Sequence, residues 1–343
     1  MQSYYFYHYF SLFGVEKTAL WILNINSYFY AVKYHYNIME NKHLFKYWRK
    51  GINDRYDGWR VTKIDPTFAM IPYFLRTRMD SQNFFEESLS IDHIEEFIKE
   101  HREDIPNLSI MHVLMAALTR LISQRPRLNR YVMWNKIYAR NYISMSIAIK
   151  RSLTLDGEET LIKPYFMPDA TLQDVVRITR EELDKTQNEG QQNGSDTMSK
   201  LLGMLPPWLM RTVVFILLQL DKVGCMPKAI HKISPWHCSI FLTNIGSIGI
   251  ESIYHHLYEF GTCSMFTAMG RKSRKNIINK EGNVQEQKSI QLKFVLDERI
   301  CDGYYYAASM RLLNQILANP SVLLSPPEQV IVDDGVAKKR IDL

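Results

Sequence analysis

The stretch Gln291-Leu292-Lys293-Phe294-Val295-Leu296-Asp297-Glu298-Arg299-Ile300-Cys301-Asp302-Gly303, near the end of the chain, decides the fold. Its apolar first half is typical of a strand, and Asp302-Gly303 is a tight-turn signal. Apolar side chains at helical spacing follow, and Asn319-Pro320 predicts where that helix ends. Because a strand that delivers polar side chains to a glycine turn before a helix often builds a site, we expect functional residues at this turn.

The segments before this stretch predict a mixture of strands and helices. Residues 289–296 are expected to pair with 264–269 in antiparallel fashion, and a loop punctuated by Gly246 and Gly249 follows a strand over 238–243. Extended segments are also predicted over 71–74, 84–89, 144–150 and 161–166. Helices are expected to begin near Ser90 to Asp92, after Ser109 and at Thr171, and another spans 201–220. This order, without repeats, predicts an α+β fold.

Composition and charge exclude several classes of protein. The 343 residues are 46% hydrophobic, which is ordinary for a globular chain with a substantial core, and the net charge of +6 is mild. The densest basic run, Arg271 to Lys275, has no interleaved aromatic residue, so it favours a solvated hairpin arm over a nucleic-acid surface. There is no Walker loop, no dinucleotide-binding glycine motif and no His-Glu-x-x-His. The missing motifs leave a nucleotide site and a zinc-protease site unsupported, and the charge distribution predicts no nucleic-acid partner.

The cysteines give no sign of a metal site. They are scattered without a Cys-x-x-Cys pair, at Cys225, Cys238, Cys263 and Cys301. Free thiols in a reducing compartment are the simplest interpretation, so we predict a cytoplasmic protein without a bound metal.

The two ends of the chain differ from its centre. Residues 1–38 are rich in aromatic side chains, and they are expected to be either an extension of uncertain status or sequence upstream of a start at Met39. A domain over 39–325 and a tail over 326–343 are expected to follow. No apolar run within residues 1–38 is long enough to span a bilayer, and the apolar run at Val213 is too short as well. For the run at Val213 a buried or subunit-packing helix is favoured over a membrane-surface helix, so membrane contact is the less favoured alternative.

Several segments resemble a known family when taken in order. The run from Glu298 to Gly303 is similar to the His-x-x-x-Asp-Gly signature of the acyltransferase subunits of 2-oxo-acid dehydrogenase complexes and of chloramphenicol acetyltransferases. Thr243-Asn244-Ile245-Gly246-Ser247-Ile248-Gly249 resembles the Ser-Asn-Leu-Gly-x-x-Gly loop of that family. Pro126-Arg127-Leu128-Asn129 matches its Pro-x-Leu-Asn element, and 147–164 matches its central strands. The resemblance covers roughly residues 59–320.

This resemblance implies a fold and a reaction. The implied fold is a mixed sheet with helices packed on one side, assembled as a homotrimer with active sites between subunits and a tunnel for coenzyme A. The implied partners are an acyl-coenzyme A and an unidentified acceptor. No lipoyl domain is recognisable in this chain, which argues against a role as the swinging-arm subunit of a dehydrogenase complex.

In the mechanism that the resemblance implies, the signature His takes a proton from a thiol or hydroxyl, which attacks the acyl thioester. A Ser or Thr hydroxyl stabilises the oxyanion, and the Asp orients the site. Asp302 and Gly303 match the signature, Thr243 stands where the oxyanion hydroxyl is expected, and Glu298 replaces the His. Taking a proton from a thiol of pKa about 8.5 costs an ordinary Glu about 6 kcal/mol, against about 3 kcal/mol for a His. Burial raises the pKa of a carboxyl group and would recover part of this difference.

A histidine elsewhere is the alternative base. His255 and His256 link the glycine loop to the next strand, so they are candidate catalytic residues as well as candidates for a structural pair. His112 lies beside an apolar helix face and is predicted to be a core histidine, and His237 is a weaker candidate for the site.

The sequence therefore predicts a coenzyme A-dependent acyltransferase whose base is a tuned Glu298, a displaced histidine or missing. The alternative is a non-catalytic relative that keeps the fold for binding or assembly.

Overall fold

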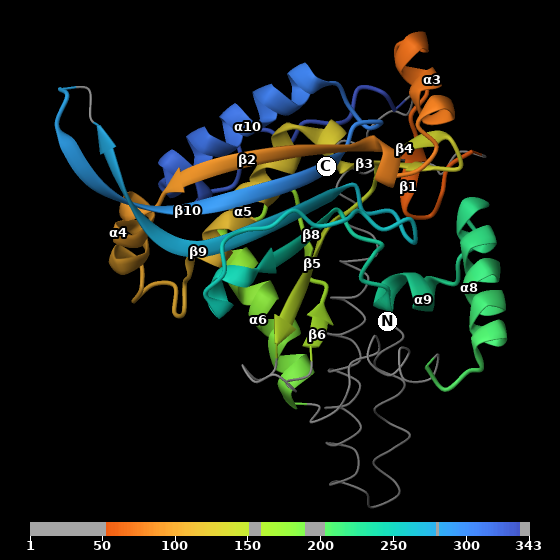
Figure 1. Cartoon of the computed structure of the whole chain (residues 1–343), viewed down its shortest axis with the longest axis horizontal. Coiled ribbons are helices and arrows are strands. Elements are labelled where there is room, and N and C mark those ends of the chain that lie inside the picture. The colour runs from red at the N-terminus through yellow and green to blue at the C-terminus, as the bar shows by residue number, and fades with distance from the viewer. Residues whose placement is uncertain (1–52, 151–158, 189–202, 279–280, 337–343) are drawn as a thin grey trace, which may run out of the picture. The chain divides into compact units, whose positions relative to one another are not determined.

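The computed structural model describes residues 53–150, 159–188, 203–278 and 281–336 (Figure 1). The expected extension over 1–38 and the last part of the expected tail lie outside the described residues.

The main sheet has seven strands of mixed direction. Its order is β2 (Gln82–Ser90), β10 (Val284–Asp297), β9 (Met265–Ile278), β8 (Ile240–Asn244), β5 (Ile143–Lys150) and β6 (Glu159–Ile162), and β7 (Tyr165–Phe166) pairs with β5. Strands β5, β8 and β9 run parallel to one another, and the other neighbours are antiparallel. The basic run from Arg271 to Lys275 lies in β9 and pairs with β10, which confirms the expected hairpin arm. A second sheet has the order β1 (Gly58–Arg60), β4 (Lys136–Arg140) and β3 (Arg130–Met133).

Four helices cover one face of the main sheet. They are α4 (Asp92–Glu100), α5 (Ile110–Gln124), α6 (Leu172–Asn188) and α10 (Gly303–Ala318). Their buried side chains form one core with alternate strand residues such as Leu242, Met265 and Phe294. Ser109 caps α5 as expected, whereas the residue before α4 is Ile91 and makes no side-chain cap. The predicted α+β class, a mixed sheet with helices on one side, is confirmed.

A segment without regular secondary structure crosses the opposite face of the sheet. This crossing segment, residues 251–263, covers the side chains of Phe241, Phe266 and Val295, which form a small buried cluster with it. Ser252 Oγ donates a hydrogen bond to Gln291 Oε1 over 2.9 Å, so the segment is tied to β10 near its N-terminal end.

The remaining helices depart from the sequence-based expectations. Residues 71–74 were expected to be extended, but they belong to α3 (Pro66–Phe74), because Asp65 caps that helix and Pro66 stands at its first position. The apolar run at Val213 forms α8 (Pro207–Lys222), which is followed by α9 (Lys228–Ile233). Asp221 is the only buried residue of α8, so the helix is not buried within the described chain, and the expected alternative of a subunit-packing helix stays a prediction. Short 3-10 helices complete the described chain at Met79–Ser81, Pro126–Asn129, Ile245–Ile248 and Pro320–Leu323.

Within the described residues, no helix has the length and apolarity that a membrane crossing requires.

Candidate active site

The loop after β10 is clamped by buried ion pairs. Arg299 donates from Nε to Asp297 Oδ1 over 2.8 Å and from Nη2 to Asp297 Oδ2 over 2.7 Å. Arg78 Nε lies 4.0 Å from the same carboxylate, and all three side chains are almost fully buried. Glu298 stands between Asp297 and Arg299, half-buried, and its backbone N–H donates to the Ser81 carbonyl over 2.8 Å. The clamp therefore fixes the backbone that presents Glu298.

Asp302 begins the helix that follows this loop. It is exposed, and its Oδ1 accepts a hydrogen bond from the Tyr305 backbone N–H over 2.9 Å, as an N-cap does. Gly303 is the first residue of α10, and a Cβ added there would meet no atom within 4 Å. The chain therefore leaves open space in front of this turn.

A cavity of about 410 Å³ adjoins the turn. It is lined by Lys63, Ile64, Asp65, Phe68, Arg127, Arg130, Cys301 and Asp302. Arg130 forms a buried pair with Asp333 over 2.6 Å, and Arg127 forms a partly exposed pair with Asp334 over 2.6 Å. Asp302 thus lines a cavity whose two arginines are already paired with carboxylates.

Thr243 lies well away from Glu298 along the strands. It stands opposite Ala268 on β9, and Ala268 stands opposite Lys293 on β10. Glu298 lies five residues beyond Lys293, which corresponds to about 16 Å along the strands. A single chain therefore does not bring the predicted oxyanion hydroxyl and the predicted base together.

The glycine loop after Thr243 packs tightly against β9. A Cβ on Gly246 would lie 2.3 Å from the carbonyl oxygen of Gly270, so only glycine fits there without a shift of backbone. Gly249 has a φ of +80°, in the left-handed region that favours glycine. Both glycines are therefore needed for the path of the loop that follows Thr243.

His255 lies on the sheet face that also carries Thr243. Its ring stacks on Phe266 at 4.3 Å between ring centroids, and Phe266 stacks on Phe241 at 4.8 Å. Phe241 precedes Thr243 by two residues on β8, so both side chains point to the same face. His256, the next residue, is exposed.

The imidazole of His255 is incompletely satisfied. Its Nε2 is buried and has no hydrogen-bond partner among the described residues. Burial, together with the charge of His256, lowers the pKa of His255, which favours a neutral ring at pH 7. A neutral imidazole with a free nitrogen can accept a proton from a substrate.

The crossing segment runs from the glycine loop to the clamp. It begins beside the glycine loop, where the Arg271 backbone N–H donates to the Ile250 carbonyl over 2.9 Å. It ends at the clamp, where Arg78 Nη1 donates to the carbonyls of Tyr258 and Glu259, each over 3.0 Å. The Glu259 carboxylate accepts from the Arg78 backbone N–H as well. The crossing segment therefore contacts both predicted halves of the site.

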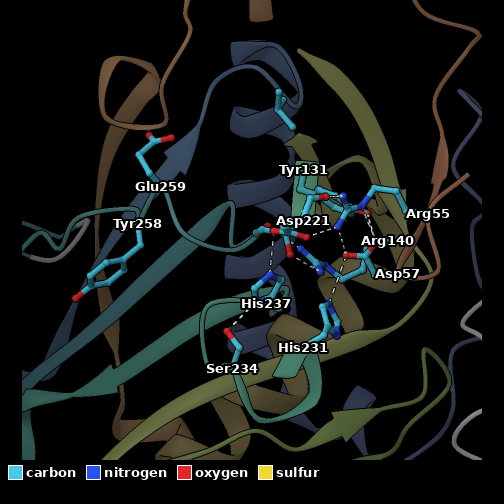
Figure 2. Close-up of polar contacts among 12 residues, drawn as sticks. Arg55, Asp57, Tyr131, Arg140, Asp221, His231, Ser234, His237, Tyr258 and Glu259 are labelled. Atoms are coloured by element: carbon cyan, nitrogen blue, oxygen red, sulfur yellow. Dashed lines mark hydrogen bonds and ion pairs between the residues drawn. The ribbon is translucent and has the colours of Figure 1, made fainter. Parts of the chain in front are cut away.

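A buried ionic network was not foreseen from the sequence (Figure 2). Arg55 pairs with Asp57 over 2.8 Å and with Asp221 over 2.6 Å, while His237 Nε2 lies 3.1 Å from Asp221 and His231 Nε2 lies 3.4 Å from Asp57. Burial lowers the pKa of His231 to about 4, although Asp57 opposes this, and burial also lowers the pKa of His237. Burial alone would raise the pKa of Asp57, but Arg55 and His231 hold it well below its usual value.

We call this network the anchor and assign it a structural role, because both of its carboxylates are already paired with Arg55 and a histidine. It ties the last turn of α8 to the segment before β1, and His237 is fully buried between Asp221 and Ser234. His112 is half-buried at the start of α5, where its Nδ1 lies 2.9 Å from Ser109 Oγ, and burial lowers its pKa to about 4. The network has no short-range signal in the sequence, since its members lie far apart along the chain.

No cluster of three or more metal-ligating side chains occurs among the residues that the structure describes.

Comparison with known proteins identifies a related domain. The family model of the "2-oxoacid dehydrogenases acyltransferase (catalytic domain)" matches residues 237–325, which include Thr243, Glu298 and Asp302. No curated protein matches the chain.

The solved structures that are similar to this chain are distant. The cubic core of the pyruvate dehydrogenase multienzyme complex is 13% identical, with a TM-score of 0.48 over 75% of this chain and 88% of that chain. A probable dihydrolipoamide acetyltransferase from Listeria monocytogenes is 11% identical, with a TM-score of 0.47 over 74% and 92%. A chloramphenicol acetyltransferase is 11% identical, with a TM-score of 0.42 over 71% and 92%. The resemblance inferred from the sequence is confirmed by the family model: residues 237–325 of this chain are similar to the catalytic domain of the 2-oxoacid dehydrogenase acyltransferases.

Proposed function

We propose that this chain is a cytoplasmic, coenzyme A-dependent acyltransferase with an altered general base. It transfers an acyl group from an acyl thioester to a thiol, hydroxyl or amine acceptor by direct attack. One observation carries the proposal: the residues that the family model matches include the turn with Glu298 and Asp302, and buried ion pairs hold the backbone of that turn in place.

The reaction needs three actions from the protein. A base takes the proton from the acceptor, the acceptor attacks the thioester carbonyl, and the oxyanion accepts a hydrogen bond from the Thr243 hydroxyl. When the tetrahedral adduct collapses, the carbon–sulfur bond breaks and the departing coenzyme A thiolate receives the proton from the base. No covalent acyl-enzyme is required.

The offset of about 16 Å along the strands between Thr243 and Glu298 supports an assembly in which two chains complete each site. In a homotrimer, Glu298 from one subunit would approach Thr243 of its neighbour, and the open space at Gly303 is compatible with such an approach. His255 is the other candidate base, because it shares a sheet face with Thr243 within one chain and its Nε2 is unpaired among the described residues. The exposed His256 stays a weaker candidate.

The test is to incubate the purified chain with a panel of acyl-coenzyme A donors and with thiol, hydroxyl and amine acceptors. Acylated product is followed by mass spectrometry, and coenzyme A binding by calorimetry. Absence of turnover with every donor, together with absence of coenzyme A binding, would contradict the proposal. Coenzyme A binding without turnover would instead favour a non-catalytic binding relative.

Substitutions identify the base. Glu298→Gln or His255→Asn, whichever removes the base, should lower kcat by about 10²-fold to 10⁴-fold. Thr243→Val should lower kcat by about 10²-fold or more through loss of the oxyanion donor. Glu103→Gln, on an exposed turn far from these residues in sequence, is the matched control and should leave the rate unchanged.

A further inference from the structure

Helix α8 exposes large apolar side chains to an unusual degree. Trp208 is 69% exposed, Phe215 61% and Ile216 49%, and Met204 and Val223 at its two ends are 77% and 60% exposed. Isolated exposed apolar residues are normal, but a run of them over one helix marks an interaction surface.

These side chains share one face of the helix. Trp208, Phe215 and Lys222 follow one another at intervals of seven residues, and Arg211 and Thr212 lie between the first two at helical spacing. The solvent-facing side of α8 therefore presents aromatic rings beside cations, which is the composition of helices that lie at a membrane interface.

The charge of this region has a single sign at the surface. Arg211, Lys222, Lys228 and Lys232 of α8 and α9 are all exposed. Asp221, the only carboxylate between Gly203 and Ile233, is 1% exposed and is paired with Arg55 and His237. No exposed carboxylate lies between Gly203 and Ile233 to offset Arg211, Lys222 and Lys228, so this surface is complementary to an anionic one.

The buried network at Asp221 fixes this surface to the rest of the fold. Arg55 donates to both the side chain and the backbone carbonyl of Asp221, at the last turn of α8. The C-terminal end of α8 is therefore fixed, while its large apolar side chains stay exposed.

We propose that α8 and α9 form a docking surface for a membrane that contains anionic lipids, with α8 lying in the interface. A helix of 16 residues is about 24 Å long, which is shorter than the roughly 30 Å hydrocarbon core, so the helix lies on the membrane and does not cross it. A second copy that offered the same face would bring these cations against one another, whereas anionic headgroups neutralise them. The proposal is independent of the acyl-transfer reaction.

The experiment is flotation of the full chain with two kinds of vesicle, phosphatidylcholine alone and phosphatidylcholine mixed with phosphatidylglycerol. We expect the chain to float with the mixed vesicles and to float much less with the neutral ones. Trp208→Ser with Phe215→Ser should lower the partition coefficient for the mixed vesicles by about tenfold or more, because two large apolar side chains no longer enter the interface. Lys222→Glu with Lys228→Glu should lower it by about tenfold or more as well, through charge.

Matched controls separate binding through this surface from nonspecific adsorption of exposed apolar side chains to vesicles. Ile278→Ser and Val284→Ser remove equally exposed apolar side chains from the β9–β10 hairpin and should leave flotation unchanged. Circular dichroism and thermal melting confirm that each variant is folded. The proposal is overturned if the chain does not float with mixed vesicles, or if the α8 variants float as well as the original chain. It is also overturned if those variants abolish self-association in solution while vesicles bind nothing.

Discussion

Two buried ionic clusters hold the two most distinctive surfaces of this protein, and they differ in what they are made of. The clamp beneath Glu298 consists of Asp297, Arg299 and Arg78. The anchor beneath α8 consists of Asp57, Asp221 and Arg55 together with His231 and His237.

Only the anchor contains histidine, the side chain that ordinarily changes charge between pH 5 and 8. The clamp also concentrates two arginines around one carboxylate, whereas the anchor shares one arginine between two carboxylates. The cluster that holds the candidate catalytic turn thus pairs its arginines with one carboxylate, Asp297. The cluster that holds α8 has two carboxylates for one arginine, and its histidines make it sensitive to pH.

The largest expected effect is at the clamp. Asp297→Asn leaves Arg299 and Arg78 buried without a carboxylate, which should lower the free energy of unfolding by about 3–5 kcal/mol. Denaturant unfolding followed by circular dichroism measures this. Asp104→Asn, on an exposed turn, is the control and should change little. A loss at Asp297 of less than about 1 kcal/mol would contradict the importance of the clamp.

Acid should weaken the anchor selectively. The pKa of His231 is lowered to about 4 in the folded chain by burial, whereas an unfolded chain takes up the proton near pH 6.5. Its stabilisation is therefore complete above about pH 6.5 and is lost as the pH falls towards about 4, by an amount of order 3 kcal/mol.

The lowered pKa values of Asp57 and Asp221 act in the same direction but at lower pH, because a carboxylate held ionised begins to lose its stabilisation only below its ordinary pKa of 3.8. The range between pH 7 and pH 4.5 therefore isolates the histidine. Melting temperatures between pH 7 and pH 4.5 measure the slope. His231→Asn should flatten it, and an unchanged slope in that variant would place the pH dependence elsewhere.

Asp221→Asn should cost less than Asp297→Asn, at about 1–3 kcal/mol, because Arg55 keeps Asp57 as a partner. The effect should be local as well. Hydrogen exchange should accelerate in α8 and leave the loop after β10 protected. Equal acceleration in both regions would show that the two clusters are not independent.

The smallest effect is at the start of α10. Asp302→Ala removes the helix cap and should cost about 1 kcal/mol, whereas Asp302→Asn keeps the cap and should cost only a few tenths of that. If Asp302 also orients the site, Asp302→Asn will lower kcat with little change in stability. Full activity in the Asn variant would assign this residue to capping alone.

Local patterns in the sequence predicted most of the elements. The strands around 238–243, 264–269 and 289–296 and the helices after Ser109 and Asp302 are present, because alternation, capping residues and prolines act over a few neighbouring residues. The same kind of reasoning was wrong at 71–74, where the cap at Asp65 set a helix in place of an extended segment. At α8 burial within the chain was wrong as well, since apolar content does not say whether a helix packs against its own chain or against another subunit.

The sequence by itself determined the turn from Glu298 to Gly303 and the glycine loop after Thr243, because each depends on a short run of neighbouring residues. These two motifs also carry the family resemblance. Only the tertiary structure decided that Thr243 and Glu298 lie well apart along the strands, that His255 shares a face with Thr243, and that Asp297 rather than Glu298 carries the buried ion pairs. These outcomes depend on strand register and on contacts between residues far apart in the chain, which the pattern along any one segment does not specify.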